Sequence, residues 1–257
     1  ALAWKLAQSP KAGKVYVADS GNFAVRLYTP NGSGGWTKSD VATSGLGGIV
    51  GIAVDGAGGF GGTGAAIYQR ADDFDAALGG SPGFTLEDFE GGAAVPGQVV
   101  ICDDPLDAAS DDRCFTPGQL VPGFRVRSTS GAGVGAVGSG FFGNASTAVG
   151  QVFLGDATIV ELERGSTRVS MDLFLYDATD EDWIGVAVYG ADGRSLGSAS
   201  IQPGAGGTLL ADAMQGFLGV IAPAPISRIE LTASRGGAFI DNLRFDAGDA
   251  IFADGFD

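Results

Sequence analysis

Apolar and polar residues alternate with a period of two along most of the chain, and helical periodicity is nearly absent. The clearest strand spans residues 167–177, where Val169, Met171, Leu173 and Leu175 fall on one face. Such alternation is typical of strands with one buried face, so it predicts an all-β protein. Further strands are predicted at residues 14–19, 24–29, 49–54, 98–102, 124–128, 157–163, 183–190, 226–233 and 238–245.

Glycine-rich turns separate these strands, and 45 of the 257 residues are glycine. Many short strands joined by such turns predict a β-sandwich or barrel. Only residues 209–214 have a short helical pattern. The strand pattern lapses in the acidic, Gly/Pro-rich residues 68–83. We therefore expect an N-terminal β segment over 1–75, a sandwich over 80–246 and an acidic C-terminal tail over 247–257.

Acidic residues outnumber basic residues by 30 to 15, which gives a formal net charge of −15. A surface of this sign repels phosphate backbones and anionic lipids, so we expect no nucleic-acid partner. Acidic loops do attract divalent cations, of which calcium is the most abundant outside cells. The longest uncharged stretch, 128–155, is rich in Gly, Ser and Asn, so no membrane span is expected.

Two cysteines, Cys102 and Cys114, flank an acidic loop of eleven residues. The chain contains no histidine, and the pair lacks the spacing of a zinc site. A disulfide is the favoured interpretation and indicates a secreted, extracellular or cell-surface protein. Two buried free thiols in a cytosolic protein remain the alternative. The first residues, Ala-Leu-Ala, fit a processed secreted product.

Residues 14–55 contain a segment that resembles one repeat of the NHL-type β-propellers. The match is carried by Tyr16–Asn22 and by Gly51–Asp55. The resemblance implies that Asp19, Gly21 and Asn22 cap a hairpin and are structural. A propeller requires several such blades, whereas this chain holds little more than one. The alternative is two or three strands joined by a turn in which an Asx side chain bonds the backbone.

The larger region contains three distinctive segments: FTLEDFEGG at 84–92, CFTPGQLVPGFRVRS at 114–128 and FLGVIAPAPISRIELTASRGGAFIDNLRF at 217–245. Together they resemble a secreted bacterial jelly-roll domain, found in PEP-CTERM-type proteins and, more distantly, in calcium-binding carbohydrate-binding modules. The resemblance implies a jelly-roll β-sandwich with a small N-terminal β appendage. The ending IFADGFD is similar to short tails of secreted Gram-negative proteins.

Asp241 is the most informative single residue, because alternation places it on one face with Phe239, Leu243 and Phe245. A carboxylate among aromatic side chains is costly unless it is paired or bound to a metal. In the resembling modules the corresponding Asp binds a structural calcium together with an acidic residue of the first strand. The matching acidic positions are Asp88 and Glu90. The alternative is an aspartate that hydrogen-bonds the backbone at the sandwich edge.

Trp183 and Trp36 are the candidate sugar-binding residues, since an exposed flat ring stacks on a sugar face. No catalytic residue is predicted, because without histidine the chain lacks the usual general base and its triads. The sequence thus predicts a non-catalytic secreted module that binds carbohydrate or a cell-surface partner and is stabilised by calcium. The alternatives are a surface-layer or filament subunit that self-assembles through strand edges, and an unrecognised hydrolase.

Overall fold

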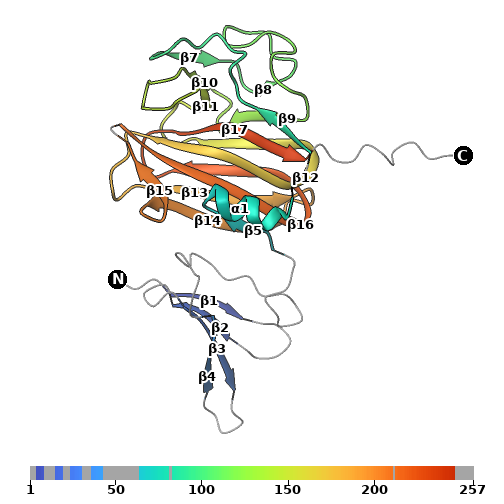
Figure 1. Ribbon diagram of the computed structural model, residues 1–257, viewed down its shortest axis with the longest axis vertical. Helices are drawn as coiled ribbons and strands as arrows, with labels where there is room; N and C mark the ends of the chain where they lie inside the picture. The colour runs from blue at the N-terminus through green and yellow to red at the C-terminus, as the bar shows by residue number, and fades with distance from the viewer. Residues whose placement is uncertain are drawn as a thin grey trace, which may run out of the picture.

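The computed structural model describes residues 4–8, 15–19, 24–30, 36–42, 64–80, 83–210 and 212–246, and its strands form two separate sheets (Figure 1). The smaller sheet is an antiparallel meander in the order β1-β2-β3-β4. Asp19 ends β2, while residues 20–22 and the Gly51–Asp55 segment lie outside the described residues. Its strands are β1 (Trp4–Gln8), β2 (Val15–Asp19), β3 (Ala24–Pro30) and β4 (Trp36–Ala42).

The larger sheet is folded into a sandwich by two long strands, β12 (Ala157–Tyr176) and β16 (Ala213–Ala233), which pair along their length. Their register is interrupted near Gly165, which has φ 71° and lies opposite Pro225. A Cβ on Gly165 would lie 2.7 Å from the Pro225 Cβ. The two strands bend at this point, so each contributes one half to each layer.

We call the layer that the helix α1 (Ala71–Leu78) does not cover the front layer and the other the back layer. The front layer contains residues 157–162 of β12 and residues 226–233 of β16. β9 lies beside β12, with β8 outside it, and β13 lies beside β16, with β14 outside it. The remaining strands are β8 (Leu106–Asp107), β9 (Phe124–Ser128), β13 (Ile184–Gly190) and β14 (Ser195–Pro203).

The back layer contains residues 168–176 of β12 and residues 213–221 of β16. On the β12 side follow β17, then β11, β10 and the edge strand β7, with β6 also paired to β17. On the β16 side lie β15 and β5. The strands are β5 (Ala66–Tyr68), β6 (Phe84–Glu87), β7 (Val99–Cys102), β10 (Val134–Val137), β11 (Ala148–Gln151), β15 (Gly206–Leu209) and β17 (Ala238–Asp246).

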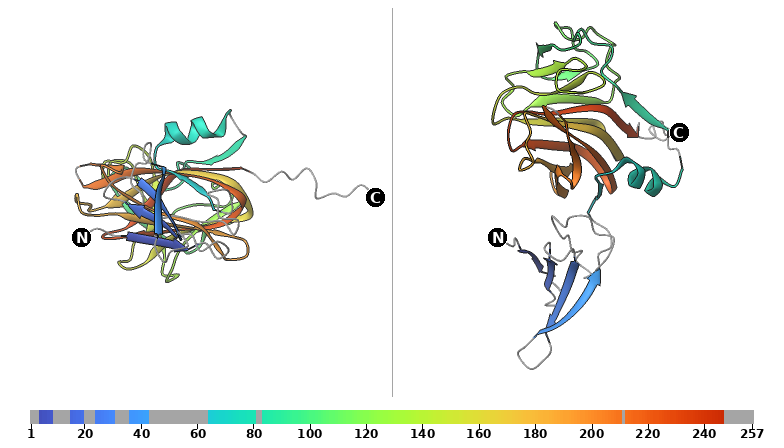
Figure 2. Two further views of the ribbon diagram at one scale, coloured as in Figure 1. Left: turned by 90° about the horizontal axis from the view of Figure 1, so that it is seen from below. Right: turned by 60° about the vertical axis from the view of Figure 1, so that its left-hand side comes forward.

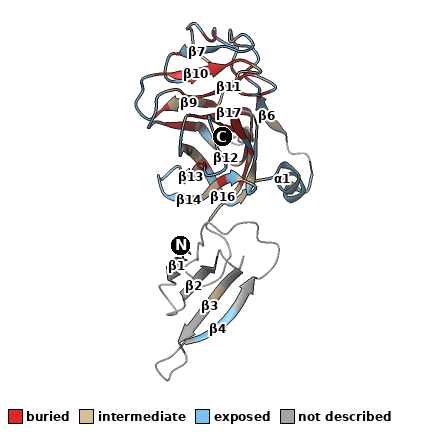
Figure 3. Ribbon diagram, turned by 90° about the vertical axis from the view of Figure 1, so that its left-hand side faces the viewer, coloured by how far each residue is buried: buried red, intermediate tan, exposed pale blue. Residues whose placement is uncertain are grey.

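One hydrophobic core fills the space between the two layers, and buried residues concentrate in the sandwich strands (Figure 3). Val169, Met171, Leu173 and Leu175 are all fully buried in it, as the alternation predicts. In β9 the alternation also holds, with Phe124 and Val126 buried and the two arginines partly exposed. The predicted fold class, an all-β jelly-roll sandwich with a small N-terminal β appendage, is confirmed.

The one α-helix among the described residues, α1 (Ala71–Leu78), lies on the outside of the sandwich (Figure 2). Its Phe74 is fully buried against β16, where Gly219 leaves room: a Cβ there would lie 2.5 Å from the Phe74 ring. No helix is predicted for this segment from its sequence, because only one short apolar stripe supports a helix there. β5 pairs with β16, so residues 66–68 belong to the larger sheet, although they fall within the N-terminal segment expected over 1–75. The expected tail, 247–257, lies outside the described residues.

Two further predictions differ from the structure. The helix expected over 209–214 is absent from the described residues of that range: Leu209 ends β15, Ala213 begins β16, and the Leu210 N–H donates to the Ala213 carbonyl. In β17 the alternation breaks at Asn242, which has φ 49° and coincides with a register shift against β12.

The break at Asn242 changes which side chains share a face. Ile240 and Leu243 both enter the main core, whereas Phe239 packs on the outer face of the back layer. Asp241 shares that outer face with Phe239, so the expected single face for Phe239, Asp241, Leu243 and Phe245 is wrong. The outer face is covered by residues 138–147, whose Phe142 packs with Phe174 and Phe239.

Candidate functional site

A row of four polar or aromatic residues crosses the outer face of the front layer. Arg125 of β9 pairs across the strands with Glu161 of β12. Glu161 pairs on its other side with Arg228 of β16, and Arg228 pairs in turn with Tyr189 of β13. Their strand neighbours point into the core, so alternation directs these four side chains outward. The sequence does not reveal this row, because it depends on the register of four separate strands.

The Arg228 guanidinium lies over the Tyr189 ring, 4.1 Å from the ring centroid. Its ion pair with Glu230 is long, at 3.9 Å between Nη2 and Oε2. Stacking on an aromatic ring fixes the plane of a guanidinium while leaving its N–H groups able to donate. Arg228 therefore offers oriented hydrogen-bond donors at the centre of the row.

Glu161 is held by a second arginine: its Oε1 accepts a 2.8 Å hydrogen bond from Arg127 Nε. Arg125 has a longer ion pair, with 3.8 Å between its Nη2 and Asp107 Oδ2. The Arg125 Nε is buried without a hydrogen-bond partner in the structure. The face thus alternates acidic and basic groups across the strands.

The row lines an open groove of about 590 Å³ on the front layer. Guanidinium groups supply donors there, and the carboxylates supply acceptors. Charged groups of both signs beside an aromatic ring can bind a ligand that has hydroxyl groups and a flat apolar face. The lining residues are Arg125, Glu161, Leu162, Glu163, Tyr189, Gly190, Ala191, Gly193, Ser227 and Arg228.

Of the two predicted sugar-binding residues, Trp183 lies on the same face of the front layer and is 39% exposed. Its ring lies over Gly185 of β13, because a Cβ on Gly185 would be 2.8 Å from Trp183 Cζ3. Trp36 is the first residue of β4 in the smaller sheet. The sequence-predicted pair is therefore divided between two sheets.

Asp241 is buried, with 1% of its surface exposed. Ser146 Oγ donates to its Oδ2, and the Asn242 N–H donates to its Oδ1 at 2.6 Å. The pKa of Asp241 is raised to about 6, chiefly by burial and with contributions from the nearby carboxylates of Asp172 and Glu90, against the lowering effect of the two hydrogen bonds. A buried carboxylate is thus surrounded by further negative charge and neutral donors.

The two other predicted metal ligands are placed differently. Glu90 interacts electrostatically with Asp241, and its Oε1 accepts a 2.5 Å hydrogen bond from the Thr147 N–H. Asp88 is exposed, and its Oδ1 accepts from the Glu90 N–H at 3.1 Å. Asp172, the cross-strand partner of Asp241, joins the cluster instead. The sequence does not identify Asp172 because the pairing register of β12 and β17 includes the bulge at Asn242.

The cluster of Glu90, Asp172 and Asp241 has the oxygen-only donors that calcium prefers. The three carboxylates do not all lie within 4.8 Å of one another, since within the described part of the chain only Cys102, Asp112 and Cys114 meet that criterion. A cation here would draw the carboxylates together or take backbone oxygens as additional ligands.

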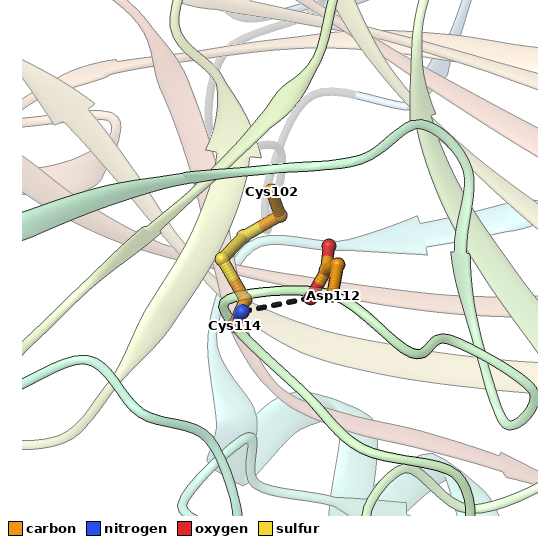
Figure 4. A group of neighbouring side chains, drawn as sticks. All are labelled: Cys102, Asp112 and Cys114. Carbon is orange, nitrogen blue, oxygen red and sulfur yellow. Dashed lines mark hydrogen bonds between the residues drawn. A yellow bond between two sulfur atoms is a disulfide. The ribbon is translucent and has the colours of Figure 1, made fainter.

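In the Cys102–Asp112–Cys114 group the two cysteines form a disulfide, and the Asp112 carboxylate lies beside it (Figure 4). The two sulfurs are therefore not available to bind a metal. Both sulfurs are bonded to each other, so neither is a thiolate. Asp112 Oδ1 accepts from the Cys114 N–H at 2.7 Å, and Oδ2 accepts from the Asp103 N–H at 2.6 Å. The predicted disulfide is therefore present, and Asp112 orders the loop that it closes.

No known family model matches the chain, and no curated protein is similar to it. Solved structures that resemble it include a mutant of a family 29 carbohydrate-binding module, with 13% identity over 58% of this chain and 89% of that chain, at a TM-score of 0.32. A cleaved adhesin domain of Lys-gingipain from Porphyromonas gingivalis has 17% identity over 65% of this chain and 99% of that chain, at a TM-score of 0.31. An exo-beta-1,3-galactanase from Phanerochaete chrysosporium has 13% identity over 94% of this chain and 56% of that chain, at a TM-score of 0.29. Similarity at this level assigns the chain to none of these groups.

Proposed function

We propose that this chain is a non-catalytic extracellular module that binds carbohydrate in the front-layer groove. The observation that carries the proposal is the row of Arg125, Glu161, Arg228 and Tyr189, with Arg228 stacked on Tyr189. Sugar hydroxyls donate and accept hydrogen bonds at once, so they match a surface that offers both guanidinium donors and carboxylate acceptors. The exposed part of the tyrosine ring supports the apolar face of a sugar.

The non-catalytic part of the proposal rests on where the unusual carboxyl groups lie. A glycosidase needs an acid whose pKa is raised beside the scissile bond. Among the described residues, burial raises the pKa of Glu87 and of Asp241, and neither lines the groove. Two carboxylates line the groove: Glu161 is engaged by Arg127, and Glu163 is exposed to solvent. These placements favour binding over hydrolysis.

The extracellular part of the proposal is supported by the Cys102–Cys114 disulfide, because such bonds persist in oxidising compartments. No described helix has the length and apolar character needed to cross a membrane.

Calcium is proposed as a structural ion beneath residues 138–147, held by Glu90, Asp172 and Asp241. The support is electrostatic: the buried Asp241 interacts with the half-buried Asp172 and the exposed Glu90, and a divalent cation would offset the repulsion among the three carboxylates. Glu90 and Asp241 also bond Thr147 and Ser146, so an ion there would tie this covering segment to the sheet.

Binding of the full chain to a panel of polysaccharides tests the proposal. Soluble glucans, xylans, mannans and galactans are cast into native gels, and insoluble cellulose and chitin are used in pull-down assays. We expect retention by at least one neutral polysaccharide and its loss in Tyr189→Ala. The control is Phe153→Ala, which removes an exposed ring (42%) that does not line the groove. Absence of retention across the panel contradicts the proposal.

A second candidate function, self-assembly through strand edges, is favoured by β7. This strand pairs with β10 alone among the described strands, and its Val99 and Ile101 are 39% and 47% exposed. Phe153 lies near Ile101, since a Cβ on Gly133 would contact both side chains. An apolar free edge can accept a further strand. Sedimentation velocity over a range of concentrations tests this: assembly that Ile101→Lys abolishes supports it, and a monomer throughout contradicts it.

A further inference from the structure

The outward face of β13 continues from the groove to Trp183. Ile184, Val186 and Val188 are buried in the core, so the residues between them face outward. Trp183 and Tyr189 therefore stand at opposite ends of one strand face. Their backbones are six positions apart, which corresponds to about 20 Å at the usual rise of an extended strand.

Hydrogen bonds fix the backbone of Trp183. Its N–H donates to Ser234 Oγ at 2.9 Å, and its carbonyl accepts from the Ser234 N–H at 3.0 Å. Ser234 Oγ in turn donates to Asp182 Oδ1 at 2.8 Å. Asp182 Oδ2 accepts from both the N–H and the hydroxyl of Thr179, at 2.9 and 2.7 Å. The turn that carries Trp183 is therefore ordered by several bonds.

The indole of Trp183 packs against the strand at a position where glycine has no side chain. Gly185 leaves the space in which the ring lies, because a Cβ there would be 2.8 Å from Trp183 Cζ3 and 2.5 Å from Thr232 Oγ1. One face of the ring packs on the strand, and 39% of the residue stays exposed. An aromatic ring held this way can stack on a sugar with little loss of side-chain entropy.

Small residues occupy the outward positions of β13 between Trp183 and Tyr189. They are Gly185, which lies beneath the indole, and Ala187, and their partners in β14 are Ser200 and Ser198. No large side chain of β13 therefore stands between the two aromatic rings. Serine hydroxyls can donate to and accept from sugar hydroxyls beside them.

We infer that Trp183 is a second subsite of the groove, and that the ligand is an extended neutral polysaccharide chain lying along β13. The inference rests on the proposed carbohydrate function. An extended chain is needed because the indole lies over Gly185, which is four positions or about 13 Å from Tyr189, and a single sugar cannot span that distance. A neutral chain fits because the charges of this face are balanced in pairs, Arg127 with Glu161, Arg228 with Glu230 and Arg125 with Asp107.

The test compares oligosaccharides from disaccharide to hexasaccharide, taken from the neutral polysaccharide that the panel identifies, by titration calorimetry on the full chain. We expect the affinity of the wild type to increase with length, and Trp183→Ala to lower hexasaccharide affinity about tenfold while leaving disaccharide affinity unchanged. Trp183→Phe keeps a flat ring and should retain most of the affinity. Tyr189→Ala should weaken every length, and Phe153→Ala none.

The outcomes separate this inference from the proposed function. If oligosaccharides bind but Trp183→Ala matches the wild type at every length, the second subsite is wrong and the groove remains. If only acidic polysaccharides bind, the neutral ligand class is wrong. If no glycan binds the wild type, the carbohydrate function fails, and the inference fails with it. Equal melting temperatures of wild type and Trp183→Ala confirm that an affinity loss is not a loss of fold.

Discussion

Arg228 and Tyr189 are cross-strand neighbours whose side chains stack, with the guanidinium carbon 4.1 Å from the ring centroid. At a partly exposed position such a contact contributes about 0.5–1 kcal/mol. Its larger effect is positional, because the ring holds the guanidinium over the groove. The two residues should therefore act on a ligand as one unit.

A double-mutant cycle tests this coupling. Tyr189→Ala and Arg228→Ala should each weaken glycan binding, and the double variant should lose about two- to fivefold less than the product of the single losses. Calorimetric titration of the four proteins gives the coupling. Strictly multiplicative losses would show that the stacked pair does not act together.

Removal of the Cys102–Cys114 disulfide should lower stability. The bond closes a loop with a sequence separation of 12, and both cysteines are buried in the main core. Loop closure of this size is worth about 3 kcal/mol in the chain-entropy model. Denaturant unfolding should show that loss for the Cys102→Ser/Cys114→Ser variant and for the reduced wild type. Unchanged midpoints would mean that the loop is ordered without the bond.

The backbone at Asn242 should discriminate among replacement residues. Its φ of 49° lies in the left-handed region, which glycine and asparagine tolerate and β-branched residues do not. Asn242→Val should cost about 1–2 kcal/mol or more, and Asn242→Gly much less. Thermal unfolding of the two variants provides the comparison, and equal losses would contradict the bulge.

Asp241 should make stability depend on pH. Its pKa is raised to about 6 by burial, so the folded chain binds this proton more tightly than the unfolded chain does. The resulting stabilisation is fully present below pH 4 and is lost as pH rises through 6. In chelator, the wild type should therefore lose stability relative to Asp241→Asn between pH 4 and pH 7, as measured by urea unfolding. Parallel pH profiles would contradict this assignment.

Calcium should offset the loss of folding stability that ionisation of Asp241 causes. Because the ion binds carboxylates, added calcium should raise the wild-type melting temperature at pH 7 more than at pH 4. Asp241→Asn and Glu90→Gln should reduce this response, and magnesium serves as the ionic-strength control. An unchanged melting temperature in calcium would rule out the structural ion.

Period-two alternation predicts the strands of the sandwich well, because burial of one sheet face leaves a local signal. Met171 and Leu173 are examples, since their faces follow from the sequence alone. Alternation fails where one residue changes the backbone geometry. At Asn242 the left-handed conformation moves Asp241 to the outer face, which a regular period of two cannot anticipate.

The site residues are harder to predict because they meet through strand register. Trp183 has a local signal, an aromatic residue at the start of a strand, and the sequence identifies it as a candidate. Arg125, Glu161 and Arg228 are charged strand residues like many others, and only the pairing of β9, β12 and β16 makes them a row. Asp172 is likewise revealed by its pairing with β17.

The decisive measurement of where carbohydrate binds is chemical-shift mapping of backbone amides on addition of the best neutral oligosaccharide. We expect shifts confined to the outer face of the front layer, centred on Arg125, Glu161, Tyr189 and Arg228 and extending to Trp183. Shifts centred on the back layer, at β10, β11 or β17, would contradict it.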